Sequence, residues 1–128
     1  MRILLDCEQL KNPYTGLYTF TQGLAEAMKR VVSDRDKLGF FVPRQKSGIM
    51  GDGYKYIERK RMSRHIPFFF VPKLDIWHTT FQLSRYTGGS IGTKKVITIH
   101  DLNFLYEKTS AHTFKRFMRK HQKYIDRV

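Results

Sequence analysis

The sequence predicts an α/β fold, a mostly parallel sheet flanked by helices, and three observations support this prediction. Short apolar runs of strand length recur along the chain, at residues 3–5, 38–42, 54–57, 75–78 and 96–99. Between the first two runs, and again after residue 110, apolar residues recur at the three- and four-residue steps of an amphipathic helix. Strands that alternate with helices in this way are typical of parallel sheets covered by helices.

The first strand and the first helix form the opening of a βαβ unit. Ile3-Leu4-Leu5 is a short buried strand, and the turn-rich residues 11–16 stop regular structure after it. The helical stripe that follows is made up of Leu17, Phe20, Leu24, Met28 and Val31. Thr19 and Gln22 fit a capping box, which would start the helix slightly later than the stripe suggests.

The middle of the chain is predicted to form three more short strands. Residues 38–42 form a second strand closed by Pro43, and a glycine-rich loop leads to a third strand over 54–57. The basic and aromatic stretch 59–72 fits neither period, and a short fourth strand covers 75–78.

The last part of the chain contains the clearest strand and a second helix. Val96–Ile99 is a continuous apolar run that ends at His100 and Asp101. From Ser110 onward the helical period returns, with apolar residues on one side and basic residues over much of the rest.

Composition limits the class of protein. The 128 residues are 41% hydrophobic, enough for one packed core, so wholesale disorder is excluded. The single cysteine, Cys7, excludes an intrachain disulfide, and His112 and His121 do not share one helix face at ligand spacing, so no metal is expected. The longest uncharged apolar run, Ile66–Pro72, is far shorter than the roughly 20 residues of a membrane span. Asp6 interrupts any signal-peptide core, so we expect a cytoplasmic domain.

The net charge of +13 is concentrated in two short segments. Residues 54–73 hold six basic and one acidic group, and residues 108–128 hold seven and one, so the pair accounts for 11 of the 13 net charges. Concentrated charge indicates a polyanionic partner, which is nucleic acid, an anionic membrane surface or the phosphates of a substrate. The alternative is that both segments are solvated, lysine-rich faces.

A candidate membrane contact lies in the first of these segments. Four basic residues precede three consecutive phenylalanines there, namely Arg59, Lys60, Arg61 and Arg64. Basic groups beside large apolar side chains suit an anionic lipid interface. The alternative, which the sequence leaves open, is that the phenylalanines belong to the core and the arginines to a solvated surface.

The first loop is the leading candidate for contact with phosphate. Ligands bind at the carboxyl ends of parallel strands, where we expect three loops, Cys7–Gly16, His78–Gln82 and His100–Asn103. Gly16 lets a ligand approach the backbone, and the helix behind it would direct free N–H groups at an anion. An ordinary turn glycine is the alternative interpretation. The dinucleotide fingerprint GxGxxG is absent, which counts against a NAD or FAD enzyme.

His100, directly after the strongest predicted strand, is the candidate catalytic residue. A histidine there can donate a hydrogen bond to a sugar hydroxyl or phosphate, or stabilise a developing charge. Asp101 beside it can orient the imidazole or cap the following segment. The alternative is a histidine that merely ends a strand. His78 has a similar place after the weaker strand, although Trp77 beside it favours packing.

These residues resemble the N-terminal domain of family 4 glycosyltransferases (glycosyl transferases group 1), whose GT-B fold pairs two Rossmann-like domains. Residues 2–6, the Gly16 loop, residues 23–28 and residues 75–78 are each similar to the start of that family. The most specific match is 96–102, Val-Ile-Thr-Ile-His-Asp-Leu, which resembles the family's strand ending in a His-Asp pair. The resemblance covers nearly the whole chain.

The resemblance implies a retaining glycosyltransferase, a hexosyltransferase that moves a sugar from a nucleotide-sugar donor to a glycan or lipid-linked acceptor in cell-surface polysaccharide or lipopolysaccharide synthesis. It implies no cofactor and no metal. His100 would lie near the transferred sugar, and the substrate-binding residues would be Thr15, Gly16, Tyr18, His78 and Asp101. Members often attach to the inner face of the cell membrane through a basic N-terminal domain, in agreement with the two basic segments.

Several features depart from the family's pattern. Glu8 stands where many relatives carry an arginine, and a single glycine replaces the paired glycines of some members. The chain also stops at Val128, after a helix and before the strand that should follow. We therefore expect residues 1–128 to be one Rossmann-like, acceptor-side domain that ends before its last strand, without the C-terminal donor-binding domain and without activity alone.

Two binding functions without catalysis are the alternatives. A nucleic-acid-binding module needs an exposed aromatic platform interleaved with Lys and Arg. Most of the 18 aromatic residues fall instead on predicted core positions, and no DNA- or RNA-binding signature is present, so no nucleic-acid partner is expected. A membrane-surface module would use segments 54–73 and 108–128.

Overall fold

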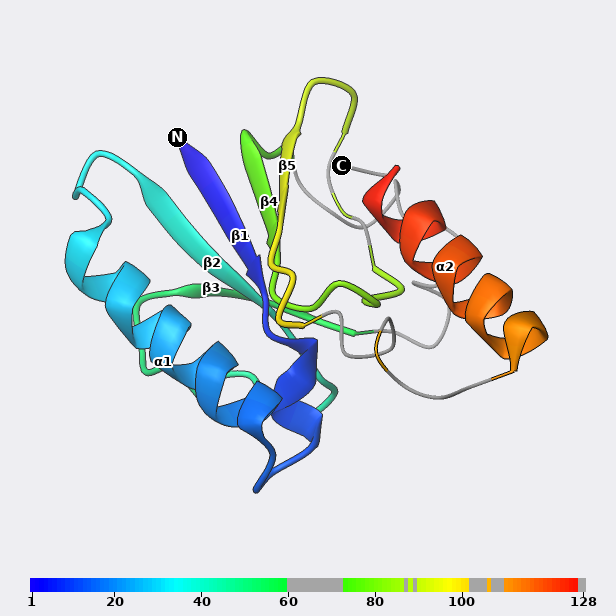
Figure 1. Ribbon diagram of the computed structural model, residues 1–128. Helices are drawn as coiled ribbons and strands as arrows, with labels where there is room; N and C mark the ends of the chain where they lie inside the picture. The colour runs from blue at the N-terminus through cyan, green and yellow to red at the C-terminus, as the bar shows by residue number, and fades with distance from the viewer. Residues whose placement is uncertain (60–72, 87, 89, 102–105, 107–109, 127–128) are drawn as a thin grey trace.

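The computed structural model describes residues 1–59, 73–86, 88, 90–101, 106 and 110–126, and it confirms the predicted Rossmann-like α/β class (Figure 1). One parallel sheet contains five strands in the order β3-β2-β1-β4-β5. The strands are β1 (Arg2–Asp6), β2 (Lys37–Val42), β3 (Lys55–Glu58), β4 (Ile76–Thr79) and β5 (Lys94–Ile97). The described helices are η1 (Glu8–Lys11), α1 (Gly16–Val31) and α2 (Ala111–Ile125). Figure 1 shows α1 on one side of the sheet and α2 on the other.

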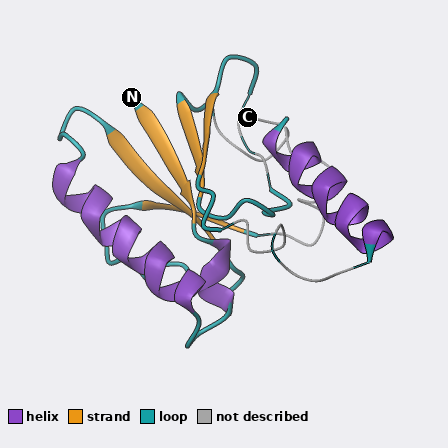
Figure 2. Cartoon of the chain, viewed as in Figure 1, coloured by secondary structure: helices purple, strands orange, loops and turns teal. Residues whose placement is uncertain are grey.

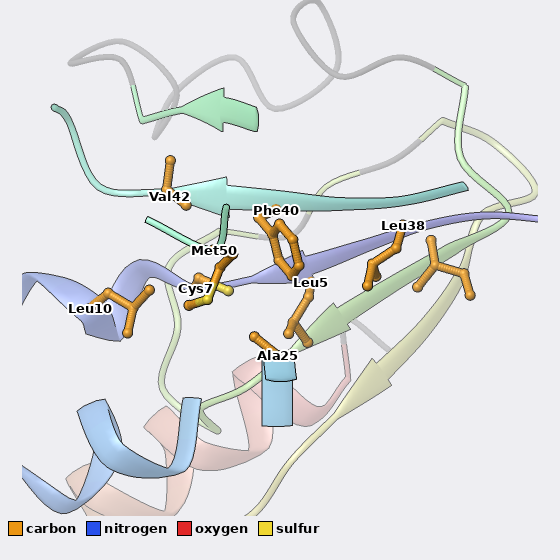
Figure 3. Close-up of a cluster of buried hydrophobic side chains, with 9 residues drawn as sticks. Leu5, Cys7, Leu10, Ala25, Leu38, Phe40, Val42 and Met50 are labelled. Atoms are coloured by element: carbon orange, nitrogen blue, oxygen red, sulfur yellow. The ribbon is translucent and has the colours of Figure 1, made fainter. Parts of the chain in front are cut away.

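The larger core fills the space between α1 and the sheet (Figure 3). Successive side chains of a strand point to opposite faces, so alternate residues of β1 and β2 belong to this core. These strand residues are Ile3, Leu5, Leu38, Phe40 and Val42. Cys7 and Met50 from loops, Leu10 from η1 and Ala25 from α1 are buried with them. Tyr54 and Tyr56, from the end of the glycine-rich loop and from β3, pack against its margin.

A smaller core lies on the opposite face, around Trp77 of β4. The Phe41 ring packs 5.5 Å from the Trp77 ring and 5.1 Å from the Tyr86 ring, centroid to centroid. Gly88 lies directly against the indole, because a Cβ added there would sit 1.9 Å from Trp77 Cε3. Only glycine fits at that position without a rearrangement of the core.

The helix α1 begins at Gly16, so the start predicted from the capping box at Thr19 is wrong. Thr15 is the N-cap residue: its backbone is extended, and its Oγ1 accepts a hydrogen bond from the Tyr18 N–H at 3.2 Å. Thr19 lies inside the first turn, where its hydroxyl donates to the Thr15 carbonyl at 3.4 Å. The cap therefore coincides with the beginning of the apolar stripe, as the stripe alone predicts.

The strand predicted over 96–99 begins two residues earlier. Pairing with β4 sets its limits, since Ile76 is opposite Lys94 and Thr79 is opposite Ile97. Lys94 and Lys95 are exposed at the end of the strand order, where charged residues are tolerated and protect a sheet edge. The apolar run alone therefore placed this strand too late.

The helix α2 follows the prediction from Ser110 onward. Ser110 is its N-cap, with Oγ accepting from the Thr113 N–H at 3.3 Å. His121 is its one buried residue among those described, and the His121 Nδ1–H donates to the Phe117 carbonyl at 2.9 Å. Among the described residues, no helix is both long and apolar enough to cross a membrane.

Candidate functional site

The strand order indicates a ligand site at the carboxyl ends of β1 and β4. The chain winds outward from β1 through β2 to β3 and then returns to the other side of β1 as β4. In doubly wound sheets, ligands bind outside the carboxyl ends of the strands at the point where the winding reverses. Here β1 ends at Asp6 and β4 ends at Thr79, and Figure 2 shows the loops gathered at this end of the strands, beside η1.

Asp6, the last residue of β1, has a buried carboxyl group at the carboxyl-end edge of the sheet, where the strands β1 and β4 end. Only 1% of the residue is exposed, its Oδ2 accepts from the Ser84 hydroxyl at 2.7 Å, and its Oδ1 accepts from the Glu8 N–H at 2.9 Å. Burial raises the pKa of Asp6 to about 7, against the opposing effect of these two hydrogen bonds. Burial also holds the pKa of the adjoining Cys7 thiol well above its ordinary value.

Thr80, the first residue after β4, joins three parts of the edge. Its hydroxyl donates to the Asp6 carbonyl at 2.7 Å and accepts from the Thr21 hydroxyl of α1 at 3.4 Å. Its carbonyl accepts from His100 Nε2 at 2.7 Å. The side chain is fully buried, so these hydrogen bonds fix the positions of β1, α1 and the loop after β5 relative to one another.

The imidazole of His100 is held in one orientation. Because a carbonyl only accepts, Nε2 carries the hydrogen in the bond to Thr80, and Nδ1 is the ring nitrogen that this bond leaves for another partner. The Phe20 ring meets the imidazole edge-on at 4.5 Å between centroids, and the Phe81 ring lies 6.5 Å away. The His100 N–H donates to Gln82 Oε1, and Gln82 Nε2 donates to the Asp101 carbonyl, both at 3.3 Å.

Two of the three expected loops, those after β4 and β5, contact each other through their described residues. Thr80 and Gln82 of the loop after β4 bond to His100 and Asp101 of the loop after β5, and Thr80 also bonds to Asp6. Asn103 lies outside the described residues.

Glu8 is a buried carboxylate that two basic residues neutralise. Lys11 Nζ lies 2.6 Å from both Glu8 carboxylate oxygens, and Arg59 Nη1 lies 2.9 Å from Oε1. A buried charge is tolerated when it is paired and hydrogen-bonded in this way. The Glu8 carboxylate is thus matched by two cations, one from η1 and one from the residue after β3.

The predicted phosphate loop is exposed at its end, where α1 begins. Gly16 is exposed, with no atom within 4 Å of where a Cβ would lie, and it begins α1 directly after the exposed cap Thr15. Tyr18, also predicted to bind substrate, packs half-buried against the larger core. Tyr14, before the cap, is exposed and has a φ of 65°, a conformation that non-glycine residues adopt at a cost.

His78 lies inside β4, because the strand continues one residue beyond its predicted end. Its Nε2 is 2.9 Å from the Thr98 hydroxyl, and burial lowers the pKa of its imidazole. Leu5, its partner in β1, belongs to the larger core, and His78 itself is half-buried. The position directly after the strand, which the sequence assigned to His78, is occupied by Thr80.

Of the four predicted membrane contacts, Arg59 is described and pairs with Glu8. Lys60, Arg61 and Arg64 lie outside the described residues. Within the described ranges, no three His, Cys, Asp or Glu side chains converge on a point that could hold a metal ion.

A cavity of about 380 Å³ opens beside this edge, between η1, the 81–86 loop and α2. Its described lining combines cations with polar and aromatic groups, including Lys11, Arg85, Lys120, Gln9, Ser84 and Tyr86. Ser84 is one of these lining residues, and its hydroxyl donates a hydrogen bond to the Asp6 carboxyl. The cavity wall is therefore directly bonded to Asp6.

Sequence reasoning missed Thr80, Gln82 and Ser84 as members of the site. Each is a common polar residue in a loop, and the one available signal was position, since all three lie within six residues after the strand predicted over 75–78. Comparison with protein-family models, with curated proteins and with solved structures finds no match to this chain.

Proposed function

We propose that this chain is the acceptor-side domain of a retaining glycosyltransferase that uses a nucleotide-sugar donor. The observation that carries the proposal is the His100-Asp101 pair in the loop after β5, in a segment that resembles that family's most specific motif. The pair lies at the edge where the reversal of strand order favours ligand binding.

The geometry around His100 suits contact with a sugar. With Nε2 bonded to Thr80, Nδ1 is the ring nitrogen that would form a hydrogen bond with a sugar hydroxyl. Phe20 and Gln82 fix the ring and its backbone, so little rotational freedom is lost when a ligand binds. Across the edge, the exposed Gly16 and the amino end of α1 suit a phosphate group of the donor or acceptor.

The test uses the complete protein encoded by the native reading frame, assayed for release of nucleoside diphosphate from UDP- and GDP-sugars with lipid or glycan acceptors. Replacing His100 by alanine should lower turnover by at least about tenfold. The fold should lose only about 1 kcal/mol, the contribution of one hydrogen bond. His112→Ala, an exposed change in α2, serves as the control and should leave both turnover and stability unchanged.

Three results would count against the proposal. If His100→Ala lost stability and kept its specific turnover, His100 would be a structural histidine only. If the complete protein consumed no nucleotide sugar, the transferase assignment would fail. Turnover by residues 1–128 alone would contradict the proposal that catalysis needs both an acceptor-side and a donor-binding domain.

We propose further that the enzyme acts at the cytoplasmic face of a membrane, attached peripherally. The support is the charge of α2, whose exposed basic residues are Lys115, Arg116, Arg119, Lys120 and Lys123. Anionic lipid attracts such residues by about 1 kcal/mol each. In a sedimentation assay, the protein should bind anionic vesicles and release them as salt rises, and equal binding to neutral vesicles would exclude this role.

A further inference from the structure

The cavity between η1, the 81–86 loop and α2 has the composition of a ligand site that the proposed function leaves unassigned. Its volume of about 380 Å³ falls within the range of small-molecule sites, roughly 300–1,000 Å³. None of the residues predicted to bind substrate, from Thr15 to Asp101, is among its described lining residues.

Positive charge dominates the described wall. Lys11, Arg85 and Lys120 come from three separate parts of the chain and line the same space. Glu8 is the acidic residue in the described lining, and its carboxylate is already paired with Lys11 and Arg59. Arg85 and Lys120 have no acidic partner within the described part of the chain. The cavity thus retains a net positive charge that an anionic ligand would neutralise.

The side chain of Gln9 adds an amide to the wall of the cavity. Gln9 is only 6% exposed and lines the cavity, yet within the described residues its side chain has no hydrogen-bond partner. No described side-chain nitrogen or oxygen is both buried and without a partner, so the Gln9 amide atoms are open to the cavity, where they offer a donor and an acceptor. A hydroxyl or phosphate oxygen of a bound molecule would pair with them.

We propose that this cavity binds a phosphorylated, hydroxyl-bearing small molecule. Its phosphate contacts Arg85, Lys120 and Lys11, and a hydroxyl pairs with the Gln9 amide. Arginine and lysine are the usual protein partners of phosphate, arginine through its planar fork of donors. This proposal concerns binding only and does not depend on the proposed transferase activity. The binding site and the transferase activity can therefore be tested, and rejected, separately.

The test is calorimetric titration of the protein with glucose 6-phosphate, glucose and inorganic phosphate at constant salt. Glucose 6-phosphate should bind, inorganic phosphate should bind more weakly because it offers no hydroxyl group to Gln9, and glucose should not bind. Binding of glucose as tight as that of its phosphate would overturn the role of the cations. Equal affinity for inorganic phosphate would overturn the role of Gln9, and no heat with any probe at millimolar concentration would overturn the site.

Matched variants separate a site from general charge attraction. Arg85→Gln with Lys120→Gln should weaken glucose 6-phosphate binding by at least tenfold, about the effect of losing one charged hydrogen bond. Arg30→Gln with Lys115→Gln removes the same charge from exposed positions outside the described cavity lining and should change affinity less than about twofold. Equal losses in the two pairs would overturn the proposal and favour diffuse binding of polyanions such as nucleic acid.

A variant of the amide gives a readout that does not depend on charge. Gln9→Met keeps the volume and removes both polar atoms, so the fold should keep its stability because no protein partner is lost. The affinity for glucose 6-phosphate should fall towards that for inorganic phosphate. An unchanged affinity would show that the amide does not contact the ligand.

Discussion

Replacing Gly88 by alanine is expected to destabilise the fold by about 3 kcal/mol, the upper end of the usual cost of overpacking a core. The added methyl group would lie 1.9 Å from Trp77 Cε3 and 2.0 Å from Cζ3, far inside van der Waals contact. Trp77 cannot retreat easily, because it is 1% exposed and its ring packs against Phe41. Its Nε1–H also donates to the Thr79 hydroxyl at 2.8 Å.

The measurement is urea denaturation followed by the fluorescence of Trp77, the only tryptophan in the sequence. Gly23→Ala is the matched control, since nothing lies within 4 Å of a Cβ at that helix position. The control should raise stability by about 0.5–1 kcal/mol, the propensity difference between glycine and alanine in a helix. If both variants were equally stable, Gly88 would not lie against the indole.

The stability of the protein should fall as pH rises from about 4 to about 7, through Asp6. Its pKa in the folded protein, about 7, is raised above the ordinary value of 3.8. In that interval the unfolded chain releases the proton and the folded chain keeps it, so each pH unit costs about 1.4 kcal/mol. The full penalty is on the order of 4 kcal/mol, absent below the unfolded pKa and complete above the folded one.

The experiment compares the free energy of unfolding of the wild type and Asp6→Asn between pH 4 and pH 8. The difference between them should move in favour of the variant by about 4 kcal/mol across this range. Because asparagine does not titrate, other groups such as His78, whose lowered pKa acts in the opposite direction, cancel in the comparison. Asp52→Asn, an exposed change, should keep the wild-type slope. Parallel curves for wild type and Asp6→Asn would show that the buried carboxyl does not titrate here.

Local pattern was sufficient to predict the fold class and the edge at which the loops meet. Buried strands such as Leu38–Val42 are continuous apolar runs, and parallel strands always bring their carboxyl ends together. Where β5 begins could not be predicted from that pattern, since its limits depend on hydrogen bonding to β4 and its first residues are lysines.

The interior of the candidate site depends on contacts between residues distant in sequence, which no local pattern reports. Ser84 bonds to Asp6 across 78 positions, and Arg59 pairs with Glu8 across 51. The pKa of Asp6 follows from its burial, which a strand-end aspartate in the sequence does not reveal. His78 was misplaced for a simpler reason: β4 extends through Thr79, so the following position belongs to Thr80.

The hydrogen bonds of Thr80 have a consequence for motion. Three segments, from β1, α1 and the loop after β5, are bonded to one buried residue, so none of them can open without breaking a shared contact. We expect such segments to unfold together as one cooperative unit, so that their amide hydrogens exchange with solvent at a common free energy. The imidazole of His100 is thus already oriented by the fold, so a ligand that binds at this end of the strands would need no folding step before binding.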